Sequence, residues 1–262
     1  MRPVTLITGA SSGIGAELAH VFAEHGHELV LTARREAELA ALAGAIAAAG
    51  HARPLVLPLD LAQRDAVARL TATLATNGVE PDNVVNNAGY GLAGKAAELD
   101  RDDQLAMIDL NVRALTELSL AFADSLMRHR GGILNVASVA AFLPGPGMAI
   151  YYASKAYVLS FSEALHQELR SRGVRVTALC PGPVATGFQV RAGLRPGGAG
   201  DQAILALPAR RVAEIGYEGL ARGKRVVVAG LANKAAIFLM RLVPHALLLP
   251  LVRDRMRAAA NR

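Results

Sequence analysis

The sequence predicts an α/β protein with one doubly wound parallel sheet covered by helices on both faces. Apolar, β-branched runs alternate with stretches of helical apolar spacing up to about residue 182. The runs are apolar throughout rather than at every second residue, which is typical of parallel strands buried on both faces. A length of 262 residues suits one large domain, so we treat residues 1–262 as a single domain.

Each predicted strand is a short apolar run that closes on turn residues. The runs cover residues 3–9, 27–33, 52–60, 82–89, 131–138, 174–182 and 224–230. Helical spacing fills most of the intervals, at residues 13–26, 35–50, 63–78, about 102–130, about 150–173 and about 208–223. This alternation predicts right-handed crossovers between parallel strands.

Two segments near the C-terminus depart from the alternation. Residues 187–205 are rich in glycine and have no clear period, which indicates a mobile loop beside the substrate. Residues 233–262 form a tail of apolar clusters that holds six basic residues and one acidic residue. Most of the net charge of +6 therefore lies in the tail rather than across the body.

Composition excludes several function classes. Aromatic residues are only 4% of the chain, and no basic stripe crosses the body, so we expect no nucleic-acid partner. Cys180 is the only cysteine, which rules out an internal disulfide and suits a buried, inert thiol. The histidines have no metal-ligand spacing, so no metal site is expected. The chain opens directly on a strand without a signal-peptide pattern, and we expect a cytoplasmic protein.

A glycine-rich turn, "TGASSGIG" (residues 8–15), joins the first predicted strand to the first helix. Glycines allow a tight turn and close backbone approach there. The start of the helix offers unpaired N–H groups and the positive end of the helix dipole to a pyrophosphate. The position of the turn favours dinucleotide binding over an ordinary structural turn.

The spacing G-x-x-x-G-x-G resembles the short-chain dehydrogenase/reductase family, whose members have a Rossmann-type fold. Two further matches follow in family order: "NNAG" at residues 86–89 and "PGPVAT" at residues 181–186. The resemblance spans roughly residues 3–188. It implies an oxidoreductase that transfers hydride between a nicotinamide cofactor and a carbonyl or alcohol.

The end of the second strand predicts which nicotinamide cofactor is used. An acidic side chain there would accept a hydrogen bond from the ribose 2′-hydroxyl of NAD, but this chain has Ala33 followed by Arg34 and Arg35. A guanidinium can pair with a 2′-phosphate. We therefore predict NADP(H), although both arginines could instead lie at a solvated helix start.

The stretch "AIYYASKAY" (residues 149–157) is predicted to carry the acid–base chemistry. Reduction of a ketone needs a proton donor at the carbonyl oxygen, and an ammonium one helical turn away favours the phenolate of a tyrosine. On a helix, Tyr151 and Tyr152 lie about 40° and about 60° from Lys155, whereas Tyr157 lies about 160° away. Geometry excludes Tyr157 and assigns it to packing, but does not separate Tyr151 from Tyr152.

The family pattern chooses Tyr151, because Y-x-x-x-K fits Tyr151 and Lys155 with a serine, Ser138, about a dozen residues upstream. The resemblance also implies Asn111, in "DLNVRA", as the residue that holds a water linking Lys155 to solvent. By resemblance, Ser138 polarises the carbonyl and Lys155 binds the nicotinamide ribose and lowers the tyrosine pKa.

The resemblance implies a set of cofactor contacts in addition to these four residues. Asp60 and Leu61 would meet adenine, residues 87–89 the adenosine ribose, and Val184 with Thr186 the carboxamide; Asp60 could instead cap the helix starting near Gln63. The full set is Gly9, Ser11, Ser12, Gly13, Ile14, Gly15, Arg34, Arg35, Asp60, Leu61, Asn87, Ala88, Gly89, Tyr151, Lys155, Pro181, Gly182, Val184 and Thr186.

The substrate is less well defined than the cofactor. Predicted pocket-edge residues are mostly apolar and suit a lipophilic carbonyl compound or secondary alcohol: Tyr90, Phe142, Leu143, Met148 and the 187–205 loop. Arg191 and Arg195 could meet an anionic substrate such as an acyl thioester. The alternatives are a 3-oxoacyl thioester reductase and a non-catalytic NADP(H)-binding sensor or scaffold.

The tail leaves several partners open. Its longest uncharged run, residues 242–252, contains Pro244 and Pro250 and is too short to span a bilayer. The tail could lie on an anionic membrane surface, cover the pocket mouth, or pack on the body or a second subunit. The family resemblance implies a homodimer or homotetramer that pairs the long fourth and fifth helices.

Overall fold

Seven parallel strands form one sheet in the computed structural model, which describes residues 1–184, 187–193 and 206–261. The strands are β1 (Arg2–Thr8), β2 (Leu29–Ala33), β3 (Leu55–Pro58), β4 (Val79–Asn86), β5 (Gly132–Val136), β6 (Arg175–Cys180) and β7 (Val226–Val228). Their order across the sheet is β3-β2-β1-β4-β5-β6-β7, and every pairing is parallel. The predicted doubly wound α/β fold is therefore confirmed.

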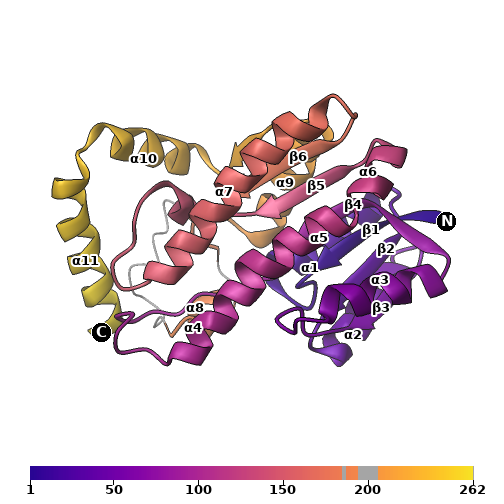
Figure 1. Cartoon of the computed structure of the whole chain (residues 1–262), viewed down its shortest axis with the longest axis horizontal. Helices are drawn as coiled ribbons and strands as arrows, with labels where there is room; N and C mark the ends of the chain where they lie inside the picture. The colour runs from indigo at the N-terminus through magenta and orange to yellow at the C-terminus, as the bar shows by residue number, and fades with distance from the viewer. Residues whose placement is uncertain (185–186, 194–205, 262) are drawn as a thin grey trace.

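Helices cover both faces of the sheet (Figure 1). One apolar layer joins the sheet to α1 (Gly13–Glu24), α2 (Glu36–Ala48) and α9 (Ala209–Ala221). A second layer joins the other face to α3 (Ala66–Thr76), α5 (Leu115–Ala121) and α7 (Ala149–Arg170). Strands with a helix layer on each side must be apolar on both faces, which explains their continuous apolar runs.

The single long helix predicted for residues 102–130 is divided in the structure. It comprises α4 (Arg101–Ile108), a π-helical turn η1 (Asp109–Ala114), α5 and α6 (Ala123–His129). The wider π-helical turn changes the direction in which its side chains leave the helix, and such turns are frequent at functional sites. Apolar spacing does not reveal it, because the helical pattern continues on both sides.

The site is positioned where the strand order reverses. The chain runs outward from β1 through β2 to β3, and then returns to place β4 on the other side of β1. Open α/β sheets bind ligands at the carboxyl ends of the strands at such a point. Here β1 leads into the glycine-rich turn and β4 leads into residues 87–89.

The tail forms two helices, α10 (Leu231–Leu242) and α11 (His245–Asn261), separated at Val243 and Pro244. Both extend away from the sheet at the left of the view in Figure 1. Within the described residues, no helix is both long and apolar enough to cross a bilayer.

Candidate functional site

The glycine-rich turn and the end of β4 are tied together by hydrogen bonds. Asn87 Nδ2 donates to the carbonyls of Thr8 and Gly9 at 2.9 and 3.2 Å, and Thr8 Oγ1 accepts from the amides of Asn87 and Ala88, both at 3.0 Å. A Cβ on Gly15 would lie 2.4 Å from Asn87 Nδ2, so only glycine allows this approach. Two segments far apart in the sequence, the glycine-rich turn and residues 87–88, thus form one surface, which we call the floor of the site.

The start of α1 fits a cofactor pyrophosphate. Gly13 has φ of +57°, which lets the chain turn into the helix immediately after Ser12. The Ser12 side chain, at the N-cap position, makes no capping hydrogen bond to the first turn. The first-turn N–H groups therefore have no side-chain acceptor from Ser12, and the start of the helix approaches Asn87 at Gly15.

Arg34 and Arg35 follow β2, as the sequence indicates, but they have different surroundings. The Arg35 guanidinium reaches over the glycine-rich turn and donates to Ser11 Oγ at 3.0 Å and to Ser12 Oγ at 2.8 Å. It also pairs with Glu38 at 3.4 Å. Burial is the main cause that lowers the pKa of the Arg191 guanidinium. The nearby charge of Arg34 lowers it further.

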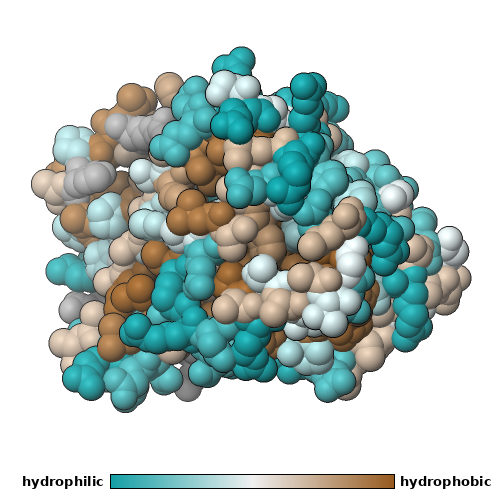
Figure 2. Space-filling view, turned by 45° about the vertical axis from the view of Figure 1, so that its right-hand side comes forward, coloured by the Kyte–Doolittle hydropathy of each residue, from teal (hydrophilic) through white to brown (hydrophobic). Residues whose placement is uncertain are grey.

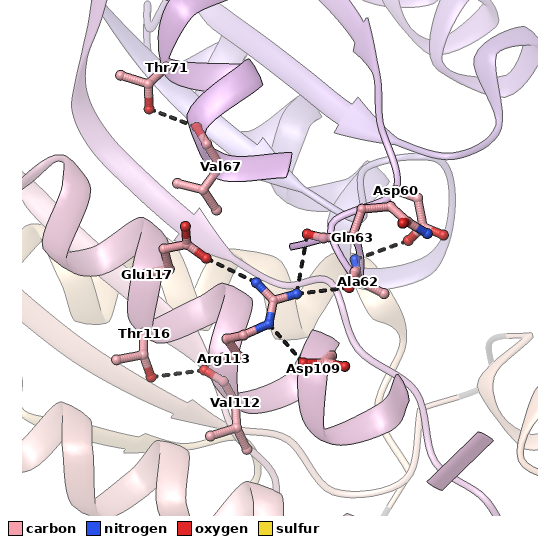
Figure 3. Close-up of polar contacts among 10 residues, drawn as sticks. All are labelled: Asp60, Ala62, Gln63, Val67, Thr71, Asp109, Val112, Arg113, Thr116 and Glu117. Atoms are coloured by element: carbon pink, nitrogen blue, oxygen red, sulfur yellow. Dashed lines mark hydrogen bonds and ion pairs between the residues drawn. The ribbon is translucent and has the colours of Figure 1, made fainter. Parts of the chain in front are cut away.

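Arg113 holds the loop after β3 through hydrogen bonds to its backbone, as Figure 3 shows. Arg113 Nη2 donates to the carbonyls of Ala62 and Gln63 at 2.8 and 3.2 Å, while its Nε and Nη1 bind Asp109 and Glu117 at 2.7 and 3.0 Å. Arg113 therefore joins the loop to the π-helical turn that carries Asn111.

Asp60 and Leu61 lie in this loop and present different groups. Asp60 Oδ1 accepts from the amide of Ala62 at 3.1 Å and so closes the turn. The next helix begins at Ala66 rather than near Gln63, with Asp65 at its N-cap position, so Asp60 does not cap it. Leu61 is 3% exposed and belongs to the core, which leaves its backbone as the group available to adenine.

Ser138 and Tyr151 come together from β5 and α7. Ser138 follows the carboxyl end of β5, and its Oγ accepts from the amide of Ala140 at 3.1 Å. Burial raises the pKa of Tyr151 to about 12, and a hydrogen bond from the side chain of Ser138 partly offsets this. The phenol is thus held in its protonated form beside a second hydroxyl.

The neighbouring tyrosines have other environments. The ring of Tyr152 packs over Gly145, where a Cβ would lie 2.3 Å from its Cγ, whereas the ring of Tyr151 lies beside Gly91 and Phe188. Tyr157, which the sequence assigns to packing, stacks on Phe161 at 5.8 Å while its hydroxyl bonds Thr116 at 2.9 Å; it remains 40% exposed. Ser138 thus lies close enough to lower the pKa of Tyr151, whereas the ring of Tyr152 packs against Gly145.

Lys155 is buried one turn along α7 from Tyr151. Its Nζ donates to the carbonyl of Val136 at 2.8 Å and lies 6.0 Å from the centre of the Tyr151 ring. Burial lowers the pKa of Lys155 to about 8. A Cβ on Gly89 would come within 3.4 Å of this Nζ, so the ammonium lies directly below the end of the "NNAG" segment.

Asn111 holds the backbone that follows Gly89. Its Oδ1 accepts from the amide of Tyr90 at 3.1 Å, and its Nδ2 donates to the carbonyl of Tyr90 at 2.9 Å and to Ser154 Oγ at 3.1 Å. Ser154 Oγ in turn donates to the carbonyl of Tyr151 at 2.7 Å. A chain of hydrogen bonds thus connects the π-helical turn to the helix that carries Tyr151.

A short helix, α8 (Phe188–Arg191), lies between Tyr151 and Tyr90. Phe188 packs on the Tyr151 ring at 5.3 Å, and the Arg191 guanidinium carbon lies 4.5 Å from the centre of the Tyr90 ring. The carbonyl of Ala192 accepts from the amide of Ala93 at 2.8 Å and fixes the helix to the segment after β4.

The segment after β6 is held by the tail and by α8. The carbonyl of Pro181 accepts from the amide of Val139 at 2.9 Å, and the carbonyl of Val184 accepts from Gln189 Nε2 at 2.8 Å. A Cβ on Gly182 would lie 2.4 Å from Asn233 Nδ2, so the start of α10 packs directly on this turn. Thr186, Arg195 and residues 194–205 of the predicted loop lie outside the described residues.

Several residues important to this geometry carried no usable signal in the sequence. Arg113 and Asn233 act through segments that are distant in the chain, and only the fold brings those segments together. Phe188 lies in the 187–205 loop predicted at the pocket edge, but the sequence did not single it out. Ser154 had a weak signal, because it lies one turn from Tyr151 on the same helix. Met148, predicted at the pocket edge, is 4% exposed and belongs to the core beneath Gly91.

Thiol and metal chemistry receive no support from the described part of the chain. Cys180 is fully buried, and burial raises the pKa of its thiol to about 12, so the thiol stays protonated. No group of three or more His, Cys, Asp or Glu side chains within the described ranges could hold a metal ion.

Comparison with known proteins agrees with this architecture. The short chain dehydrogenase family profile matches residues 3–195, and the chain belongs to that family. Sulfoacetaldehyde reductase from Chromohalobacter salexigens is 40% identical over 206 residues, which cover 78% of this chain and 79% of that protein. The chain is thus an NAD(P)-dependent oxidoreductase of the alcohol–carbonyl class.

Solved structures match over nearly the whole chain. A short-chain dehydrogenase from Sphingobium yanoikuyae in complex with NADPH has a TM-score of 0.78 and 32% identity, covering 93% of this chain and 97% of that one. A short-chain dehydrogenase/reductase from Burkholderia phymatum in complex with NAD has a TM-score of 0.79 and 31% identity, with coverage of 91% and 92%. Neighbours of this fold therefore hold either nicotinamide cofactor.

Proposed function

We propose that this protein is an NADP(H)-dependent oxidoreductase that interconverts a lipophilic carbonyl compound and its secondary alcohol. The observation that carries the proposal is the meeting of Ser138 and Tyr151 above the buried Lys155, at the sheet position where the floor fits a dinucleotide. A protein that only bound the cofactor would have no use for a protonated phenol at this point.

The proposed reduction adds a hydride to the carbonyl carbon and a proton to the carbonyl oxygen. Bound NADPH would supply the hydride. Tyr151 donates its phenolic proton to the oxygen, and Ser138 donates a hydrogen bond that orients the carbonyl. Lys155 holds positive charge beneath the phenolate that remains, which favours proton release. Asn111 acts as a positioning residue, because it fixes the backbone of Tyr90, the residue that follows Gly89.

Preference for NADP(H) is supported by the positive charge at the adenosine end. Arg34 and Arg35 follow β2, and Ala33 stands where a carboxylate would repel a 2′-phosphate. Arg191 adds a third guanidinium close to Arg34. Burial lowers the pKa of Arg191, and the charges of Arg34 and Arg35 lower it further. Tyr90 and Asp60 act in the opposite direction. A phosphate group would relieve the repulsion between Arg34 and Arg191.

A cofactor titration tests this assignment. Arg34→Ala should raise the dissociation constant for NADPH about tenfold to a hundredfold, because one or two charge-assisted hydrogen bonds are lost. Its affinity for NADH should stay within about twofold. A wild-type protein that binds NADH more tightly than NADPH would refute the preference while leaving the oxidoreductase assignment intact.

A lipophilic substrate is supported by the side chains around Tyr151. Phe188 packs on its ring, and Met148 and the Tyr151 ring both lie against Gly91. A screen of NADPH oxidation against ketones of increasing chain and ring size should give a kcat/KM that rises with apolar area. A preference for small polar aldehydes would contradict the proposal.

An anionic carbonyl substrate is the second candidate, and Arg191 favours it. A relative is named for sulfoacetaldehyde, an anion, and an acyl thioester of coenzyme A or phosphopantetheine bears the phosphate groups of its carrier. Kinetics of the Arg191→Gln variant distinguish an anionic substrate from a lipophilic one. An increase in the KM of the carbonyl substrate alone would place Arg191 at the substrate, whereas weaker NADPH binding would place it at the cofactor.

We further propose a homodimer or homotetramer in which α5 and α7 form the contact. Leu120 on α5 and Tyr157 on α7 are exposed by 58% and 40%, so these helices present apolar groups outward. Leu120→Arg should reduce the molar mass measured by light scattering. An unchanged mass would argue against this contact.

A further inference from the structure

The C-terminal arm, which we define as residues 231–254, presents an outward apolar stripe. On α10, Leu231, Phe238 and Leu242 are 83%, 64% and 67% exposed, and they lie within about 40° of one another around the helix. On α11, Leu247 and Leu251 are exposed by 64% and 67% and are one turn apart. Helices of water-soluble proteins normally turn such a stripe inward.

The opposite side of α10 accounts for its attachment to the body. Asn233 and Ile237 are buried, and Asn233 packs on the turn at Gly182. The helix therefore packs on the body with the face that carries Asn233 and Ile237, while its apolar stripe stays exposed. In the space-filling view, hydrophobic surface also gathers on the side where α10 and α11 lie (Figure 2).

Cations border the stripe. Exposed Lys234 lies beside it on α10, and exposed Arg253 lies beyond its end on α11, where its Nε bonds Asp254 at 2.8 Å. The sequence from residue 231 to the C-terminus holds six basic residues and one acidic residue. An apolar stripe edged by positive charge is the pattern of helices that lie in the plane of a membrane interface.

A hollow at the root of α10 adjoins the stripe. It has a volume of about 320 Å³, and its lining includes Arg211, Lys224 and Lys234 together with one carboxylate, that of Glu218. Leu231, the first residue of the stripe, lines the same hollow. Because Arg211 is paired with Glu214 at 3.0 Å, the excess positive charge at this space comes from Lys224 and Lys234, and it lies directly beside exposed Leu231.

We infer that the C-terminal arm docks on a bilayer surface that contains anionic phospholipid. The stripe enters the boundary between headgroups and acyl chains, and the hollow receives a phosphate headgroup. A second copy of the chain is the competing occupant. In a two-fold symmetric contact, however, the same surface faces itself, which would bring together two arms that each hold three basic residues and one acidic residue.

Docking would present the substrate side of the enzyme to the membrane. Helix α10 packs on the turn at Gly182, and Val184, two residues later, accepts a hydrogen bond from Gln189 of α8. Helix α8 in turn lies beside Tyr151. A lipophilic carbonyl compound dissolved in the bilayer would then reach the site over a short distance. This consequence rests on the proposed function, but the docking itself does not.

Vesicle sedimentation of the full-length protein tests the inference without any turnover. Vesicles of phosphatidylcholine alone and of equal parts phosphatidylcholine and phosphatidylglycerol serve as the two probes. We expect sedimentation with the second kind that is at least about tenfold greater, and that falls as salt rises. Equal sedimentation with both kinds, or with neither, would overturn the inference.

Two variants with matched controls locate the contact. Phe238→Asp with Leu242→Asp should abolish sedimentation, whereas Leu105→Asp, at an exposed leucine of α4, should not. Lys224→Ala with Lys234→Ala should lower the partition coefficient about 25-fold, at roughly fivefold for each charge. Arg53→Ala should leave it unchanged.

Misfolding and a subunit contact are each tested by one further measurement. Turnover of a soluble carbonyl compound without vesicles should be the same in the Phe238→Asp, Leu242→Asp variant as in the wild type, so loss of vesicle binding cannot be attributed to misfolding. Light scattering should give both proteins the same molar mass. If the variant falls to a smaller assembly, the stripe is a subunit contact and the inference is wrong.

Discussion

Tyr151 and Tyr152 are adjacent in the chain, but their rings face different surroundings. The ring of Tyr152 is closed against Gly145, while that of Tyr151 lies next to Phe188, with Ser138 close enough to affect its pKa. Helical geometry alone left these two residues as alternatives. At the scale of single residues, therefore, the packing partner rather than the angle to Lys155 distinguishes them.

Removal of the phenolic hydroxyl of Tyr151 provides the most direct test. Tyr151→Phe should lower kcat by about 10²-fold to 10⁴-fold, because general acid catalysis is lost. NADPH affinity, measured by fluorescence titration, should change little. Tyr152→Phe is the matched control and should keep most of the activity; the reverse result would make Tyr152 the proton donor.

The dependence of rate on pH should differ between the two directions of the reaction. Burial raises the pKa of Tyr151 to about 12, so below that pH the phenol predominates, which is the form that reduction requires. Oxidation requires the phenolate, whose fraction rises about tenfold for each pH unit below the pKa. Initial oxidation rates should therefore climb between about pH 7 and about pH 8, above which Lys155 loses its charge, while reduction rates should not climb. Reduction that accelerates with pH would contradict the role of Tyr151.

Among the elements of the fold, the π-helical turn η1 connects the two ends of the site. Asn111 within it holds the backbone of Tyr90, and Arg113 holds the carbonyls of Ala62 and Gln63 (Figure 3). The Arg113 side chain is 26% exposed and donates from all three of its nitrogens. The loop that carries Asp60 and the segment after β4 thus depend on the same turn.

Shortening the reach of Arg113 should weaken cofactor binding more than chemistry. Arg113→Lys loses the planar fork that serves two carbonyls and two carboxylates, and should destabilise the fold by about 1–3 kcal/mol. The KM of the cofactor should rise several-fold, with a smaller change in kcat. Arg69→Lys, at an exposed ion pair with Asp65 on α3, is the control. Equal effects of the two variants on KM would show that Arg113 does not position the loop.

At the scale of the whole molecule, stability comes from the two apolar layers around the sheet. Phe22 is fully buried in the layer of α1, α2 and α9, with the rings of His27 and Tyr217 at 5.1 and 4.9 Å. Helix α1 carries Phe22 on one face and begins at the glycine-rich turn. The core and the candidate cofactor site are therefore built on the same element.

Truncation of Phe22 should destabilise the entire fold. Phe22→Ala should lower the free energy of unfolding by about 3–5 kcal/mol and the melting temperature by roughly 10 °C, because it leaves a cavity under α1. Circular dichroism melts would measure this. Phe238→Ala, at a phenylalanine that is 64% exposed, should melt within about 1–2 °C of the wild type. A small effect at Phe22 would mean that the core relaxes around the loss.

The amino-acid sequence by itself determined the strands, most helices, the glycine-rich turn and the position of two candidate tyrosines, Tyr151 and Tyr152, on one helix with Lys155. Each of these depends on local periodicity, on the conformations open to glycine, or on spacing along one helix. The tertiary structure decided the rest: the split of the helix after Arg101 at η1, the hold of Arg113 on the Asp60 loop, and the packing of Phe188 and Asn233 on distant turns. Such contacts join residues far apart in the chain, and no local pattern records which segments the sheet brings together.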